Sequence, residues 1–274
     1  MKHAPLALAG LLAVTLLPVT APAAVKTTPG QADQRFAQLE QLLPTPNTVR
    51  TASGAPGAQY WQQRADYRIK VTLDETRHRL KARQSITYMN RSPDTLSYIW
   101  LQLDQNIFKD DSIARRSEVA ANSGTRRDSV GKGDSLSFAA MRRHQAFQDR
   151  KYGYDIGQVR DASGRVLRTT VNDTMMRIDL PQPLRPGTSI EIRFDWESNI
   201  VNEAAIGARG GYEYFEGSDT YQYFLAQWFP RLVAYTDYTG WQHKQFLGRG
   251  EFTLEFGDYD VELTVPADHI VAST

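Results

Sequence analysis

The residues best suited to metal-assisted hydrolysis are the histidines, and their spacing argues against a zinc site. A hydrolytic zinc centre on a helix needs two imidazoles one turn apart with a glutamate between them, the spacing of His-Glu-x-x-His. No two histidines of this chain lie three to five residues apart, and none is followed by Glu. We therefore expect no metal site and no catalytic residue in this chain. The histidines are His3, His78, His144, His243 and His269.

Other reactive patterns are incomplete. The sequence contains no Gly-x-Ser-x-Gly stretch, which would mark a nucleophilic serine. The stretch Gly248-Arg249-Gly250 lacks the third glycine of a nucleotide fingerprint and precedes an expected strand rather than a helix. The paired carboxylates Asp110 and Asp111 lie in a polar stretch, which is more typical of a solvated surface than of a catalytic dyad.

Aromatic side chains gather near the carboxyl end of the sequence, around Gln227. Such rings form a core or a seam between domains, or they stack on a bound ligand, and the sequence leaves both open. The side-chain carbonyl of Gln227 can accept a hydrogen bond from an ammonium group, and it can equally satisfy backbone groups between its aromatic neighbours. The rings are Tyr221, Tyr223, Phe224, Trp228 and Trp241.

Charge and composition exclude several classes of partner. The formal charge is only +1, and the basic stretch from residue 109 to residue 151 holds few aromatic rings. Nucleic-acid binding favours denser positive charge interleaved with stacking rings, so we expect no nucleic-acid partner. The chain contains no cysteine, so a hydrophobic core rather than disulfides must supply its stability.

The first residues resemble an export signal. Lys2 supplies a positive start, residues 6–17 form an apolar run, and Ala21-Pro22-Ala23 fits the small-x-small cleavage pattern. We expect cleavage after Ala23, an exported protein in the periplasm or outside the cell, and no stable membrane span once the signal is removed. A retained anchor is the alternative. Residues 24–58 are expected to form a short amphipathic helix, at 31–43, and a linker.

Alternating apolar residues then predict an all-β domain over residues 59–274. Residues 67–73 and 80–88 predict an antiparallel hairpin, and residues 252–256 and 261–265 predict another at the end. The fold class is an antiparallel sandwich or a large curved, saddle-like sheet. One long polar loop, at about 106–152, interrupts the strands and is expected to be partly helical near 137–149 or mobile.

Four ordered segments of the sequence carry a resemblance to a known family. They are Tyr67-Arg68-Ile69-Lys70-Val71, Asp104-Gln105-Asn106-Ile107-Phe108, Leu180-Pro181-Gln182-Pro183-Leu184-Arg185-Pro186-Gly187, and a final segment with Gln227-Trp228-Phe229-Pro230-Arg231, Asp237-Tyr238-Thr239-Gly240-Trp241 and Val265-Pro266-Ala267-Asp268-His269. Their order and spacing over about residues 60–274 resemble the amino-terminal β-domain of the aminopeptidase-N family of zinc metallopeptidases (gluzincins), particularly its bacterial secreted branch.

The resemblance implies a role for the chain and for one residue. A catalytic domain would follow shortly after Thr274 and would carry the zinc and the general base, so the present chain alone would be inactive. Its partners would be that downstream catalytic domain and a peptide substrate. In relatives, a Thr-Gln-x-Glu or Ser-Gln-x-Gln segment helps bind the free α-amino group of the substrate. The matching residues here are Ala226-Gln227-Trp228-Phe229, which assigns substrate binding to Gln227, although Phe229 replaces the second acceptor.

A second hypothesis comes from a different class of protein. The chain could be a free-standing exported β-sandwich module that binds sugar or peptide through the aromatic residues near Gln227. Peptide specificity and oligomeric state do not follow from the sequence under either hypothesis.

Overall fold

The computed structural model describes residues 46–118, 138–148, 150–248 and 253–273. The chain divides into two compact units, Met1–Thr45 and Pro46–Thr274, and only the second is described here. The expected signal peptide and the expected helix at 31–43 lie outside the described residues.

The larger sheet has the strand order β14-β1-β2-β8-β4, with β5 also paired to β8. Its centre is antiparallel and consists of three strands of eleven residues each, in which buried and exposed side chains alternate. This alternation places one face of each strand on the core, as the sequence predicts. The strands are β1 (Arg64–Asp74), β2 (Arg79–Met89), β8 (Ser189–Asn199), β4 (Tyr154–Ile156), β5 (Arg160–Asp161) and β14 (Tyr259–Thr264).

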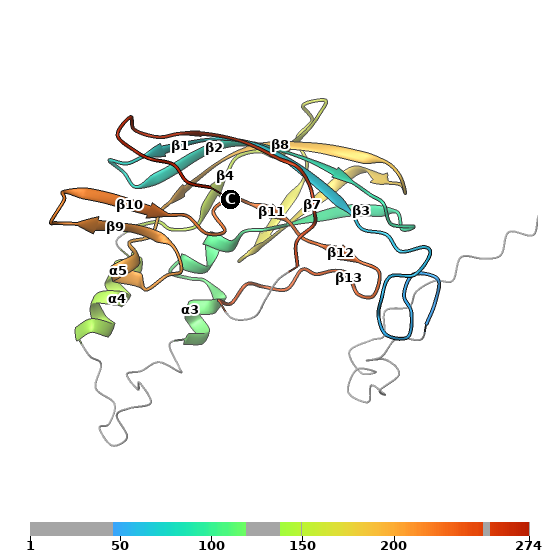
Figure 1. Ribbon diagram of the computed structural model, residues 1–274, viewed down its shortest axis with the longest axis horizontal. Coiled ribbons are helices and arrows are strands. Elements are labelled where there is room, and N and C mark those ends of the chain that lie inside the picture. The colour runs from blue at the N-terminus through green and yellow to red at the C-terminus, as the bar shows by residue number, and fades with distance from the viewer. Residues whose placement is uncertain (1–45, 119–137, 149, 249–252, 274) are drawn as a thin grey trace, which may run out of the picture. The chain divides into compact units, whose positions relative to one another are not determined.

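A smaller sheet has the order β11-β3-β7-β6. Figure 1 shows β3 and β7 beneath β1, β2 and β8, and one buried cluster takes residues from both sheets, among them Ile86 of β2 and Ile99 of β3. The protein is therefore mostly β, with two sheets sharing a core, which confirms the expected fold class. The strands are β3 (Leu96–Gln102), β6 (Thr169–Asn172), β7 (Met175–Leu184) and β11 (Arg231–Leu232).

Short helices and two hairpins are attached to these sheets (Figure 1). The long polar loop is partly helical, as expected, because α4 (Phe138–Gln148) falls within it; α3 (Ile113–Glu118) was not expected. No helix among the described residues is long and apolar enough to span a membrane. The remaining elements are η1 (Asp104–Phe108), α5 (Glu203–Ile206), the hairpin of β9 (Gly211–Phe215) with β10 (Thr220–Phe224), and the hairpin of β12 (Tyr235–Thr236) with β13 (Gly240–Trp241).

The predicted hairpin at the end of the chain is wrong. The strand β14 pairs in parallel with β1, while Phe256 bridges to Arg64 and Leu254 bridges to Val233. The chain at Gly257 passes so close to β1 that a Cβ there would overlap the main-chain carbonyl of Ala65. The glycine that looked like a hairpin turn is thus required by this close approach, and alternation alone could not distinguish the two cases.

The strand β7 contains two prolines, Pro181 and Pro183. The strand β7 continues through both prolines to Leu184, and the turn falls at Gly187, whose φ is 75°. Proline lacks a backbone N–H, so it is tolerated in a strand at positions where no neighbouring strand needs a hydrogen-bond donor. The strand β6 pairs only with the first part of β7, Met175 to Ile178, and leaves that edge open further along.

Candidate functional site

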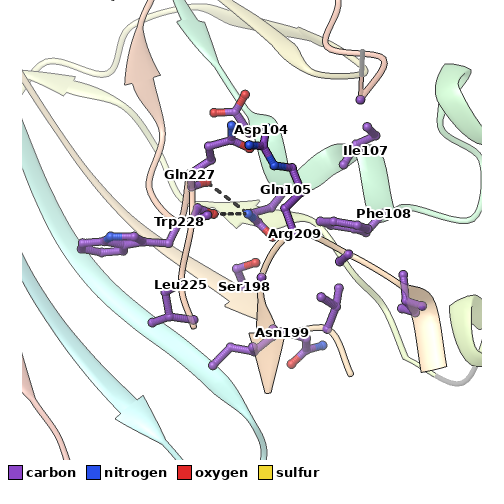
Figure 2. Close-up of a pocket in the computed structure, with 18 of the residues that line it drawn as sticks. Asp104, Gln105, Ile107, Phe108, Ser198, Asn199, Arg209, Leu225, Gln227 and Trp228 are labelled. Carbon is purple, nitrogen blue, oxygen red and sulfur yellow. Dashed lines mark hydrogen bonds between the residues drawn. The ribbon is translucent and has the colours of Figure 1, made fainter. Parts of the chain in front are cut away.

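A pocket of about 220 Å³ lies at the end of the sheets where the short helices gather. Its walls come from η1, α3, α4, the segment from α5 to β9, and residues 224–228. Figure 2 shows Gln227, Gln105, Arg209 and Trp228 around it. The predicted substrate residue therefore lies in a pocket that elements from distant parts of the sequence build.

The backbone of Gln227 is in a left-handed conformation, with φ of 53°. For a residue other than glycine this conformation costs about 1–2 kcal/mol, so the surrounding structure must hold it in place. The Nε2 amide of Gln105 donates to the main-chain carbonyls of Ala226, at 3.2 Å, and Gln227, at 3.1 Å. The Tyr154 hydroxyl donates to the same Gln227 carbonyl at 3.2 Å. Gln105 and Tyr154 thus fix the strained bend that carries Gln227.

A buried polar network anchors the residues that follow this bend. The Nε2 amide of Gln84 donates to the Pro230 carbonyl at 2.7 Å, and Trp196 Nε1 donates to Gln84 Oε1 at 2.8 Å. The Leu232 backbone N–H donates to the Tyr67 hydroxyl at 2.9 Å. Because fully bonded polar groups specify one geometry in a core, this network sets where the Gln227 segment leaves the sheet.

A buried ion pair joins Asp104, which lines the pocket, to Arg231. Both side chains are buried, with 1% and 7% of their surface exposed, and Arg231 Nε lies 2.9 Å from Asp104 Oδ2. Burial raises the pKa of Asp104, and the bonds from Arg231 and Gln102 oppose that rise. The pair joins the start of η1, which carries Gln105, to β11, which follows the Gln227 segment in the chain.

The Gln227 side chain itself is half-buried and lines the pocket. The hydrogen bonds from Gln105 and Tyr154 both go to the main-chain carbonyl of Gln227. Within the described ranges, the side-chain amide of Gln227 makes no hydrogen bond to another residue. Both the acceptor oxygen and the donor nitrogen of the amide are thus available to a ligand. Substrate binding by Gln227 stays a prediction.

The residue at the position of the second acceptor, Phe229, has a different role. Its ring packs edge-on against Tyr67, with centroids 5.7 Å apart, and against Trp228 at 4.9 Å. It belongs with the partly buried residues around the main core and does not line the pocket.

The aromatic residues near Gln227 do not form one surface. Tyr221 and Tyr223 surround His78, whose Nδ1 lies 2.7 Å from the Tyr223 hydroxyl. Trp228 contacts Trp196, and Trp241 contacts Tyr88, Tyr98 and Tyr235. These rings are neighbours in the chain, but the fold sends four of them to three separate packing sites and leaves Phe224 exposed at the pocket wall.

The charge around the pocket is mainly positive. Arg115, Arg143 and Arg209 line it, and Asp104 is the only acidic residue that does so within the described part of the chain. No group of three or more His, Cys, Asp or Glu side chains in that part is placed to hold a metal ion. The donor set of the described residues therefore does not fit a zinc centre.

Comparisons with known proteins give a distant structural likeness. No protein-family model matches the chain, and no curated protein matches it. Among solved structures, an M1 zinc metallopeptidase from Deinococcus radiodurans is similar at 14% identity and a TM-score of 0.36, over 77% of this chain and 34% of that one. A mutant of that peptidase bound to a Tyr-Ser-Ala substrate is similar at the same identity and TM-score, over 78% and 35%. The chain thus spans about a third of the length of these structures, and a likeness this weak assigns it no activity.

Proposed function

We propose that this chain contains the amino-terminal, non-catalytic β-domain of a secreted zinc aminopeptidase, and that the pocket around Gln227 forms one side of its substrate cleft. The observation that carries the proposal is the left-handed backbone of Gln227, held by Gln105 and Tyr154 while its side-chain amide stays available. Strained residues of this kind persist where the surrounding structure over-determines them, commonly at functional sites. The resemblance of residues 60–274 to the aminopeptidase-N family supplies the chemical identity of the site.

In this proposal Gln227 binds the free amino terminus of a peptide. Its Oε1 accepts one hydrogen bond from the substrate ammonium, a charge-assisted bond worth about 1.5–3 kcal/mol. The Arg209 side chain reaches into the same pocket (Figure 2), and its positive charge opposes an ammonium nearby. A carboxylate from the catalytic domain must therefore complete the amine site, since Phe229 supplies no second acceptor. Zinc, when bound in that domain, would activate water for hydrolysis.

The alternative of a free-standing module that binds sugar or peptide is not favoured. A ligand-stacking platform needs several rings on one exposed surface, whereas four of the five rings near Gln227 pack at three separate places, and only Phe224 and Trp228 of the five line the pocket. Export to the periplasm or the medium, and association with a downstream catalytic domain, remain part of the proposal and rest on the signal-like first 23 residues and on the resemblance.

The experiment compares two polypeptides, residues 1–274 alone and the product of the reading frame continued past Thr274. Metal analysis and hydrolysis of aminoacyl substrates are measured on both. We expect about one zinc per chain and aminopeptidase activity only for the longer product. A tightly held stoichiometric zinc on residues 1–274, or a stop codon directly after Thr274, would contradict the proposal.

A further inference from the structure

Two arginines at the pocket have no counter-charge among the described residues. Arg143, on α4, and Arg209, in the segment between α5 and β9, are both exposed to solvent. Among the residues that the structure describes, neither has a carboxylate within ion-pair distance. Asp104, the one acidic side chain that the described part of the chain places in the pocket wall, is already neutralised by Arg231. The pocket is thus left with an excess of positive charge.

An apolar wall lies beside these charges. The ring of Phe147 is buried, with 5% exposed, and belongs to a small cluster with Val201 and Ile206. The guanidinium carbon of Arg115 lies 3.6 Å from the centroid of that ring, which fixes a third cation at the same wall. A concave site with low-dielectric walls and one sign of charge focuses its field on a ligand of the opposite sign.

The Gln227 amide adds a directional group to this field. Its Nε2 donates hydrogen bonds while its Oε1 accepts them, so one amide can serve both an ammonium and a carboxylate. The pocket volume of about 220 Å³ lies below the roughly 300–1,000 Å³ of sites for drug-sized ligands, so it suits one residue-sized group.

We propose that this pocket binds a carboxylate of a short peptide, with Arg209 and Arg143 as the cations that select it. The carboxylate belongs either to an acidic side chain near the amino terminus or to the carboxyl terminus of the peptide. The peptide as carrier rests on the proposed function, whereas the preference for a carboxylate rests on the arginines and their surroundings.

The test uses residues 1–274 and two pairs of peptides in NMR titrations that follow the amides of Gly207, Gly211 and Ala226. Glu-Ala-Ala amide against Gln-Ala-Ala amide isolates a side-chain carboxylate. Ala-Ala-Ala against its carboxyl-terminal amide isolates the terminal one. We expect the carboxylate member of at least one pair to bind about three- to tenfold more tightly, and the difference to shrink at high salt.

The variants identify the groups responsible. Arg209→Gln and Arg143→Gln each should reduce the carboxylate preference, and together they should abolish it. Arg83→Gln serves as the control, because Arg83 is 80% exposed and pairs with Asp195, away from the pocket. The control should keep the full preference.

Three results would overturn the proposal: equal affinity within both pairs, no binding by either carboxylate peptide at the highest soluble concentration, or an equal loss in Arg83→Gln. The outcome is separable from that of the proposed function, because these titrations need no catalytic domain. Selective carboxylate binding by a chain whose longer product hydrolyses nothing would support the pocket and reject the aminopeptidase.

Discussion

The side-chain amide of Gln105 donates a hydrogen bond to the main-chain carbonyl of Gln227 at 3.1 Å, across 122 positions of the sequence. A second bond from the same amide reaches Ala226. The conformation of the residue proposed to bind substrate is therefore set by a side chain from η1, which also lines the pocket. Gln105 is a positioning residue in this arrangement, since it holds the Gln227 backbone.

Replacing Gln105 should loosen this bend. Gln105→Ala removes two hydrogen bonds to main-chain carbonyls, each worth about 0.5–1.5 kcal/mol, so we expect the free energy of unfolding to fall by about 1–3 kcal/mol. Urea denaturation of residues 1–274 measures the change. Gln222→Ala is the matched control, because Gln222 is exposed on β10, and it should stay within about 0.5 kcal/mol of the parent. Equal effects of the two substitutions would show that the Gln105 contacts do not hold the segment.

The buried ion pair under the pocket gives a larger expected effect. Asp104→Asn keeps the shape of the side chain but leaves Arg231 charged and buried without its partner, which typically costs about 3–5 kcal/mol. Thermal or urea unfolding tests this directly. Asp195→Asn breaks the exposed pair with Arg83 and should change stability by less than about 1 kcal/mol. A loss below about 1 kcal/mol for Asp104→Asn would mean that the pair does not organise η1 and β11.

Glu255 should make stability depend on pH. Burial raises its pKa from 4.5 to about 7, and the bond it accepts from the Tyr235 backbone N–H at 2.7 Å opposes the rise. Because the pKa of Glu255 is higher in the folded state, the folded state binds more protons than the unfolded state between pH 4.5 and about pH 7. The contribution of protonated Glu255 to the free energy of unfolding is therefore complete below the unfolded-state pKa. It is lost as the pH rises through the folded-state pKa of about 7.

Glu255→Gln should remove this loss and keep an acceptor for Tyr235. We expect the variant to be more stable than the parent by about 2 kcal/mol at about pH 8 and nearly equal to it at about pH 4, because one pKa unit corresponds to about 1.4 kcal/mol and partial exposure screens the effect. Unfolding curves over this pH range provide the measurement, with the exposed Glu213→Gln as control. If Glu255→Gln were less stable than the parent at about pH 8, ionised Glu255 would stabilise the fold, and the predicted pH dependence would be wrong.

Much of the sheet could be predicted from the sequence, because the alternation in β1, β2 and β8 is regular and each strand has one buried face. Alternation does not specify the partner or the direction of a strand, which is why β14 was placed in a hairpin rather than in parallel with β1. Gly257 gave the same signal for a turn as for a close approach.

The site was less predictable, because its contacts are non-local. Gln227 was identified through its resemblance to a family segment, whereas nothing in its type indicates a left-handed backbone, which Asn, Asp or Gly adopt more readily. Gln105 and Asp104 lie in a segment that carried the same resemblance, but their roles depend on partners more than 100 positions away. Apart from that resemblance, the sequence offers one signal, a run of polar residues just after the strand β3, Asp104-Gln105-Asn106.

The most direct test of the account is the kinetic effect of removing the Gln227 amide in the product of the continued reading frame. Gln227→Ala removes the side-chain acceptor. Gln227→Gly removes the same acceptor and also favours the left-handed backbone. An equal loss of activity in the two variants would therefore come from the missing amide and not from a change in backbone strain. The ratio kcat/KM is measured for a peptide with a free amino terminus and for the residual turnover of its N-acetylated form.

For the free peptide we predict a fall in kcat/KM of about ten- to a hundredfold in both variants, corresponding to the loss of about 1.5–3 kcal/mol, with unchanged turnover of the acetylated peptide and little effect on folding. A change within about twofold for the free peptide in both variants, or the same loss for the acetylated peptide, would show that Gln227 does not bind the amino terminus and would contradict the account.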